Sequence, residues 1–300
     1  MNFLTAIILQ QMNNKPQKIK ILVFLLFLCI SGVLHAQPYV DIVSIRATNS
    51  PDAGVFNRDK NPVILNYRSV NTNFPLKIGK GESRILISPF AEKWIVKNPS
   101  QNDSSQSYYG IAVPLSLRMN LANKKWEIQT TLITRMNGES IAMDTKIQFG
   151  GFFLLSYKPT ENITYKLGVY MNDELFGLFV LPLAGIDWKI NNRANLFGVF
   201  PGNLNFEYKL HTRFYTGFIL RTITNSYADV KTSYWRVNEN QFGAYLDSYL
   251  SKNIVLNLEA GHSVLRKLRS GNYELQSPYD WGINDAYYIK LMLAYRLRLR

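Results

Sequence analysis

The last segment of the chain, residues 285–299, alternates between apolar and polar side chains over an unusual length. Every second position from Tyr287 to Leu299 is apolar or aromatic, and the positions between them are mixed and basic. A period of two is that of a β-strand with one apolar and one wetted face. Strands in soluble sheets are typically about 5 to 6 residues long, whereas a tilted membrane-spanning strand needs about 9 to 11. The segment therefore predicts a strand that crosses a bilayer.

The same unit, an alternating segment followed by a turn, recurs from Gln37 onward. The mean hydropathy of −0.10 excludes a bundle of membrane helices. A barrel is compatible with this value, because only half of each spanning strand is apolar. Aromatic residues make up 13% of the chain, as interfacial girdles would require. The sequence predicts an all-β fold, a single closed antiparallel up-and-down transmembrane β-barrel.

Turn residues divide the chain into 12 to 14 predicted strands, and one segment decides the count. If residues 194–210 form one strand, the total is thirteen. Splitting them at Pro201, Gly202 and Asn203 gives fourteen, in line with the even number usual in bacterial barrels. The two halves are short for a full crossing, which would place part of this hairpin inside the lumen.

The N-terminal region has the features of a secretory signal peptide. An apolar run from Ile21 to Leu34 follows a basic stretch and precedes Ala36, where cleavage is expected. Residues 1–36 are thus a predicted signal peptide, with a second possible start at Met12, and residues 37–300 a predicted barrel domain. The expected location is the outer membrane. An uncleaved anchor on a soluble domain is the alternative.

The only cysteine, Cys29, lies inside the predicted signal peptide. The mature chain would then have neither disulfides nor thiolate chemistry. The net charge is +13, and removing Lys15, Lys18 and Lys20 leaves about +10. The basic residues are spread through strands and are not clustered with stacking aromatics, so we expect no nucleic-acid partner.

The charged residues at predicted inward positions are mostly basic. A net basic lumen would favour anions, because rings of Arg and Lys lower the barrier for negative solutes. The alternative is that these residues pair with one another and with Tyr170, Tyr215 and Tyr245 to fill a closed interior. The predicted lumen-lining residues are Arg118, Glu127, Arg135, Lys166, Arg213, Arg221, Asp247, Glu259, Lys290 and Arg296.

The histidines of the predicted mature chain are His211 and His262, which gives no ligand set for a metal. Ser263 follows His262, but neighbours in a strand point to opposite faces, so they cannot act as nucleophile and base. The stretch Gly79 to Gly81 is best interpreted as a turn rather than a phosphate loop. We therefore predict no catalytic residues, no metal and no cofactor, and a protein that is not an enzyme.

The five tryptophans lie near predicted strand ends or in loops. In a barrel they would anchor the protein at the headgroup level. In a soluble β-sandwich they would instead belong to the core. They are Trp94, Trp126, Trp188, Trp235 and Trp281.

Residues 176–210, FGLFVLPLAGIDWKINNRANLFGVFPGNLNFEYKL, resemble a family of uncharacterised outer-membrane β-barrel proteins of Gram-negative bacteria, known only as a domain of unknown function. The resemblance implies a barrel over most of the mature chain and brings no set of functional residues. Outer-membrane lipid and the barrel-assembly machinery are the expected partners. That machinery commonly reads a terminal aromatic residue, and here the last aromatic is Tyr295.

Three functions remain open from the sequence. The first is a passive pore, or a structural barrel without chemistry of its own. The second is a barrel that binds or transports a lipid or small hydrophobic ligand. The third is a secreted soluble β-sandwich that acts as a binding module.

Overall fold

The computed structural model describes most of the chain after the predicted signal peptide. The signal peptide, Cys29 and the Gly79–Gly81 turn lie outside the described residues. The described residues are 38–51, 63–78, 83–98, 104–121, 125–142, 145–230, 233–272 and 279–299.

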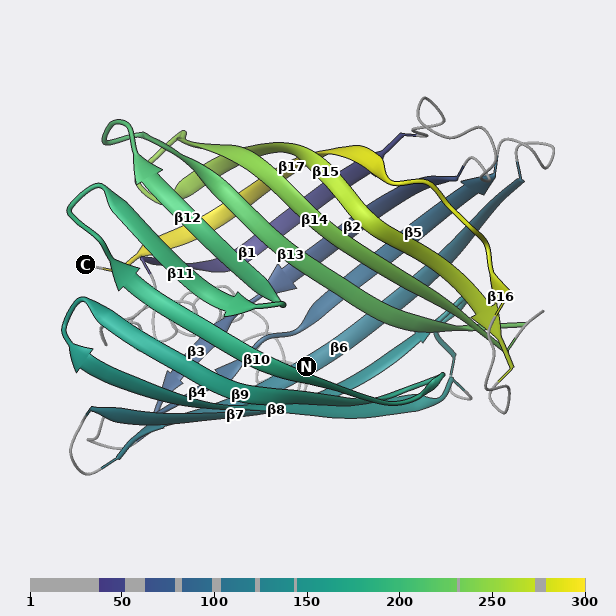
Figure 1. The fold of residues 1–300 in the computed structure, drawn as a ribbon, viewed down its shortest axis with the longest axis horizontal. Coiled ribbons are helices and arrows are strands. Elements are labelled where there is room, and N and C mark those ends of the chain that lie inside the picture. Colours follow the sequence, from purple (N-terminus) through teal and green to yellow (C-terminus); the bar gives the residue numbers. More distant parts are fainter. Residues whose placement is uncertain are drawn as a thin grey trace, which may run out of the picture.

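The described residues form strands and connections only (Figure 1). None of them belongs to a helix long and apolar enough to cross a membrane. The strands are β1 (Tyr39–Ser50), β2 (Ile64–Thr72), β3 (Phe74–Lys77), β4 (Arg84–Ile87), β5 (Phe90–Asn98), β6 (Ser104–Asn120), β7 (Trp126–Gly138), β8 (Ile147–Thr160), β9 (Ile163–Glu174), β10 (Gly177–Lys189), β11 (Ala194–Phe200), β12 (Asn203–Lys209), β13 (Phe214–Asp229), β14 (Ser233–Tyr249), β15 (Ile254–Gly271), β16 (Tyr279–Asp280) and β17 (Ala286–Arg298).

These segments make one closed antiparallel barrel of fourteen strands. β2 and β3 are two parts of one interrupted barrel strand, as are β4 and β5, and β16 is a short segment paired with β15. The first and last strands close the barrel, with Tyr39 opposite Arg298 and Asn49 opposite Ile289. The predicted fold class is confirmed, and the soluble β-sandwich is wrong because one sheet closes on itself.

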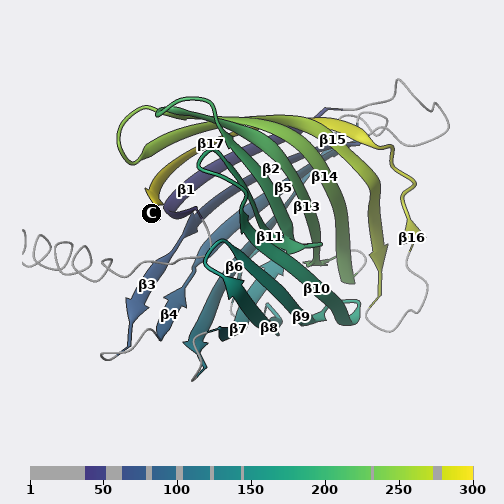
Figure 2. The ribbon, with the colours of Figure 1, turned by 60° about the vertical axis from the view of Figure 1, so that its left-hand side comes forward.

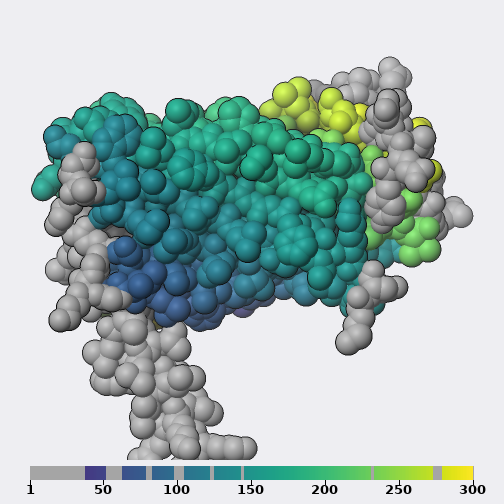
Figure 3. Space-filling view, turned by 90° about the horizontal axis from the view of Figure 1, so that it is seen from below, coloured from purple at the N-terminus to yellow at the C-terminus, as the bar shows by residue number. Residues whose placement is uncertain are grey.

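Apolar side chains lie on the outer face of the barrel and charged side chains on its inner face, the reverse of the distribution in a soluble protein. Large apolar residues are exposed on the outer face, including Leu167 at 69% and Leu178 at 72%. Figure 3 shows a continuous, convex outer surface over the blue and teal strands. Charged residues are buried on the inner face, including Asp247 at 0% and Arg296 at 1%. The alternation read from the sequence therefore separates an apolar exterior from a polar interior.

The chain splits at Pro201, as fourteen strands require, but the resulting hairpin lies in the wall and not in the lumen. β11 pairs with β10 and β12 pairs with β13. The hairpin is nevertheless short, because its pairing ends with Val199 opposite Asn203. Beyond it, the described pairing joins residues 177–183 of β10 only to β9. Figure 1 shows β11 and β12 ending between β10 and β13, which both continue past the hairpin.

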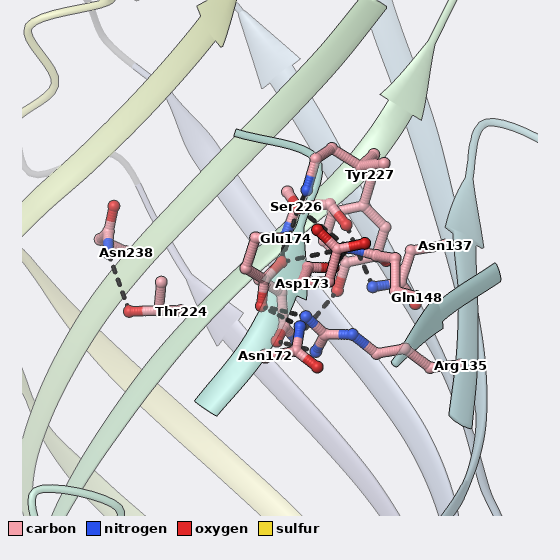
Figure 4. A network of polar contacts seen from close by, with 12 residues as sticks. Arg135, Asn137, Gln148, Asn172, Asp173, Glu174, Thr224, Ser226, Tyr227 and Asn238 are labelled. Carbon is pink, nitrogen blue, oxygen red and sulfur yellow. Dashed lines mark hydrogen bonds and ion pairs between the residues drawn. The ribbon is translucent and has the colours of Figure 1, made fainter. Parts of the chain in front are cut away.

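We call the end where β1 begins and β17 ends the terminal end, and the opposite end the far end (Figure 2). At the far end β13 crosses the interior and reaches β7, where Ala228 pairs with Gly138 in parallel. Figure 4 shows the junction, in which Glu174 from β9 contacts Arg135 from β7. Glu174 also accepts a hydrogen bond of 2.6 Å from the Ser226 hydroxyl. Glu174 thus joins the end of β9 to both β7 and β13.

An aromatic cluster fills the far end behind this junction. Tyr108 stacks on Trp235 with ring centroids 4.5 Å apart, and Trp94 lies 4.7 Å from Tyr67. Trp94 and Trp235 are each 2% exposed, so the prediction of a girdle position is wrong for both. Trp188, which is 38% exposed, has the exposure expected of a girdle residue. A smaller cluster of Tyr215, Tyr249, Val255 and Ala294 packs at the terminal end.

Candidate ligand-binding cavity

A cavity of about 820 Å³ lies between the two packed ends of the barrel. Its lining includes Tyr39, Asp41 and Arg296 toward the terminal end, and Tyr67 and Glu92 toward the far end. Arg296 donates to Asp41 at 2.6 Å and also to Asp247 at 2.6 Å. Its guanidinium stacks 3.6 Å from the centre of the Tyr39 ring. These contacts form a packed floor for the cavity.

The far side of the cavity is bounded by a buried carboxylate, Glu92. It accepts hydrogen bonds from Tyr67 at 2.8 Å, from Asn225 at 3.1 Å and from Tyr227. Since Asn225 and Tyr227 belong to β13, these bonds hold the crossing strand against β2 and β5. The aromatic cluster lies behind this layer.

One wall of the cavity is apolar although it belongs to the inner face of the barrel. It is formed by β8, β9 and β10. In β10 both faces are apolar, since Leu178 and Val180 point outward and Leu181 and Leu183 line the cavity. A water-filled barrel would place polar side chains at these inner positions. The lining residues of this wall are Phe152, Leu154, Tyr170, Phe179, Leu181 and Leu183.

The opposite wall is charged. It is made by β1, β13, β15 and β17, and its central group is Glu259, which pairs with Arg221 and Lys290. Of the charged residues in the whole lining, four are basic and three acidic: Arg46, Arg221, Lys290 and Arg296 against Asp41, Glu92 and Glu259. The cavity therefore has an apolar side and a weakly basic side.

The cavity also reaches the outer face of the barrel beside the short hairpin. Alternate residues of a strand point to the same face. Arg221 and Ile223 of β13 therefore point inward, whereas Thr222 and Thr224 point outward like the exposed Leu220. All four line the cavity, together with Gly202 at the hairpin turn. The cavity thus passes around the edge of β13 where no described strand pairs with it on that side. We call this place the side opening.

The structure places most of the ten predicted lumen residues inside the barrel. Arg221, Glu259, Lys290 and Arg296 line the cavity, and Asp247 is buried against Arg296. The remaining predicted residues form pairs outside the cavity lining or lie at the surface. These are Lys166 with Asp187, Arg118 with Glu127, Arg135 with Glu174, and Arg213, which is exposed in the turn before β13. That they contact a solute stays a prediction.

Three charged residues of the cavity were missed by sequence reasoning: Asp41, Arg46 and Glu92. Arg46 follows the parity of the buried Ser44 and Thr48, so the alternation of β1 would have identified it. Glu92 lies on the same face of β5 as the buried Trp94. Because Trp94 is apolar, the sequence does not mark this face as the polar inner face.

The described residues contain no group of three or more His, Cys, Asp or Glu side chains that could hold a metal ion. His211 is exposed beside the turn after β12. The ring of His262 packs against Tyr287 with centroids 4.9 Å apart. Neither histidine lines the cavity.

A protein family described as a domain of unknown function, DUF6268, matches residues 120–296, which is more than half of the chain. The chain belongs to this family. The DUF6268 match runs from β7 into β17 and includes the short hairpin, both partners of the far-end junction and the apolar wall. The resemblance inferred from residues 176–210 is confirmed. No curated protein matches the sequence.

Solved structures with a similar architecture include an outer-membrane channel from Pseudomonas putida F1, with a TM-score of 0.48, 8% identity and coverage of 88% of this DUF6268 chain and 98% of that one. A Pseudomonas aeruginosa FadL homologue has a TM-score of 0.45 and 10% identity, covering 86% and 90%. Outer membrane phospholipase A from Escherichia coli has a TM-score of 0.37 and 10% identity, covering 85% and 96%.

Proposed function

We propose that this DUF6268 protein is an outer-membrane barrel that binds a small hydrophobic or lipid-like molecule in its interior. The apolar wall formed by β8, β9 and β10 carries this proposal. Binding sites for small molecules are mostly apolar with a few placed polar groups, whereas a conducting lumen is polar throughout. The cavity lining, with Leu181 and Leu183 opposite Arg221 and Lys290, fits the first description.

The proposed location is the outer membrane. It is supported by the apolar outer face, because exposed side chains such as Leu167 and Ile289 would be covered by hydrocarbon. The predicted signal peptide, residues 1–36, is consistent with export. Surrounding lipid and the barrel-assembly machinery are the partners that this location implies, and nucleic acid is not among them.

A passive pore or structural barrel with a net basic lumen is the leading prediction from the sequence. It is disfavoured because the aromatic cluster fills the far end, and because the basic excess of the cavity lining is a single charge. A catalytic role is disfavoured because His211 and His262 both lie away from the cavity. Binding without chemistry is the function that this interior supports best.

Conductance and probe binding test the proposed function together. Protein reconstituted in planar bilayers should carry no steady ionic current, since both ends of the cavity are packed. The same preparation should bind a fluorescent apolar probe such as N-phenyl-naphthylamine with saturation, and heat-unfolded protein is the control. A steady current, or the absence of saturable probe binding, would refute the proposal.

The side opening gives a second, kinetic expectation. Gly202→Trp should slow both association and dissociation of the probe several-fold and leave Kd nearly unchanged, because the indole would narrow the opening without touching the apolar wall. A side chain fits there, since the nearest atom to a Cβ at position 202 is the Val199 carbonyl oxygen at 3.4 Å. Stopped-flow fluorescence measures both rates. Asn192→Trp, in the exposed turn at the terminal end, is the matched control. Unchanged rates in Gly202→Trp would exclude this route.

A further inference from the structure

Arg46 stands out among the charged residues of the cavity because it has no counter-ion. Its Nε donates to the Thr48 hydroxyl at 3.0 Å, and its Nη2 donates to the side-chain amide oxygen of Gln241 at 3.4 Å. The guanidinium lies 4.9 Å from the centre of the Tyr67 ring. Among the described residues, no carboxylate lies within ion-pair distance of Arg46.

The three carboxylates of the cavity lining are already engaged elsewhere. Asp41 binds Arg296 in two hydrogen bonds. Glu92 accepts from two tyrosines and an asparagine. Glu259 is shared by Arg221, Lys290 and the Tyr288 hydroxyl. None of them forms an ion pair with Arg46.

A second guanidinium lies next to Arg46. Arg221 donates to the same side-chain amide oxygen of Gln241 at 2.8 Å, so the two guanidinium groups meet at one acceptor. Arg46, Arg221 and Lys290 are three basic side chains of one cavity, and Glu259 pairs with only the last two. Like charges in a partly dehydrated cavity repel one another, and a bound anion would relieve that repulsion.

We infer that Arg46 binds the anionic head group of an amphiphile whose apolar body lies against the wall formed by β8, β9 and β10. This inference rests on the proposed function and names the class of ligand. A carboxylate, sulfonate or phosphate offers two oxygens to the guanidinium fork, and the remaining donors of Arg46 can bind them. The apolar and the charged residues line one cavity, so a single molecule can contact both.

A pair of ligands that differ only in the head tests the inference. Decanesulfonate is permanently charged and decanol is neutral, and both can be titrated calorimetrically into the protein in a non-ionic detergent. The native protein should bind the sulfonate more tightly than the alcohol. Arg46→Gln should weaken sulfonate binding by about tenfold to a hundredfold and leave decanol binding unchanged, because one charge-assisted contact is lost. Arg46→Lys should restore part of the preference.

Arg118→Gln is the matched control, since Arg118 pairs with Glu127 outside the cavity lining and its loss should not alter the preference. Heat-modifiable gel migration confirms that each variant forms the barrel. If both ligands bind equally to the native protein and to Arg46→Gln, the assignment of Arg46 is wrong while the proposed function stands. If neither ligand binds the native protein, the proposed function itself fails.

Discussion

Arg296→Ala should lower the free energy of unfolding by about 3 to 5 kcal/mol, the cost of breaking a buried ion pair from one side. Arg296 is 1% exposed and joins Asp41 on β1 to Asp247 on β14. Its removal leaves the fully buried Asp247 without a cation, and it loosens the seam where β1 meets β17. Urea unfolding of the refolded barrel, followed by gel mobility, measures the difference.

Arg213→Ala is the control for this experiment, because an exposed turn residue should change stability by no more than about 0.5 kcal/mol. A triple variant, Arg296→Met with Asp41→Leu and Asp247→Leu, should recover much of the loss, since replacing a whole buried ionic group by apolar residues is often close to neutral. Equal stabilities of Arg296→Ala and Arg213→Ala would contradict the role assigned to Arg296.

Glu174→Ala should destabilise the barrel by a similar amount, about 3 to 5 kcal/mol, through the far-end junction. Glu174 is 1% exposed and binds Arg135, Asn172 and Ser226. Without it the Arg135 guanidinium, itself buried, keeps only the 2.9 Å hydrogen bond to Asn225 among its described contacts. The Tyr108 and Trp235 rings lie close by, so near-ultraviolet circular dichroism during urea unfolding reports on the same region.

A double-mutant cycle separates the pair from the rest of the junction. Arg135→Met combined with Glu174→Ala should be more stable than Glu174→Ala alone, because no unpaired charge remains. Additive losses in the two single variants would mean that Arg135 and Glu174 do not act together.

The barrel and its strand count follow from local patterns in the sequence. Alternation over about 13 residues identified the last strand, and Pro201 with Gly202 identified the break that makes the count even. Parity also placed Arg221 and Lys290 correctly on the inner face. It failed for Arg213, because parity assigns a face only within a strand and β13 begins at Phe214.

The cavity was harder to predict because it depends on how distant strands meet. In β10 both faces are apolar, so the alternation that marks an inner face disappears at Leu181 and Leu183, which line the apolar wall of the cavity. The burial of Trp94 and Trp235 results from β13 crossing to β7, which no local pattern records. That Arg46 lacks an ion-pair partner among the described residues could not be inferred either, because pairing depends on which carboxylates the other strands bring in.

The crossing of β13 also sets an order of assembly. Arg135 and Asn225 are 90 positions apart in the chain, so their contact closes a very long loop, whereas each hairpin between them joins neighbouring segments. Closing long loops costs more chain entropy and is slow, so the local hairpins are expected to form first. Asp41 and Arg296 are 255 positions apart, so pairing β1 with β17 closes a still longer loop than the contact of Arg135 with Asn225. Both the β1–β17 seam and the far-end junction are therefore expected to form after the hairpins, and until then the polar inner face stays in contact with water.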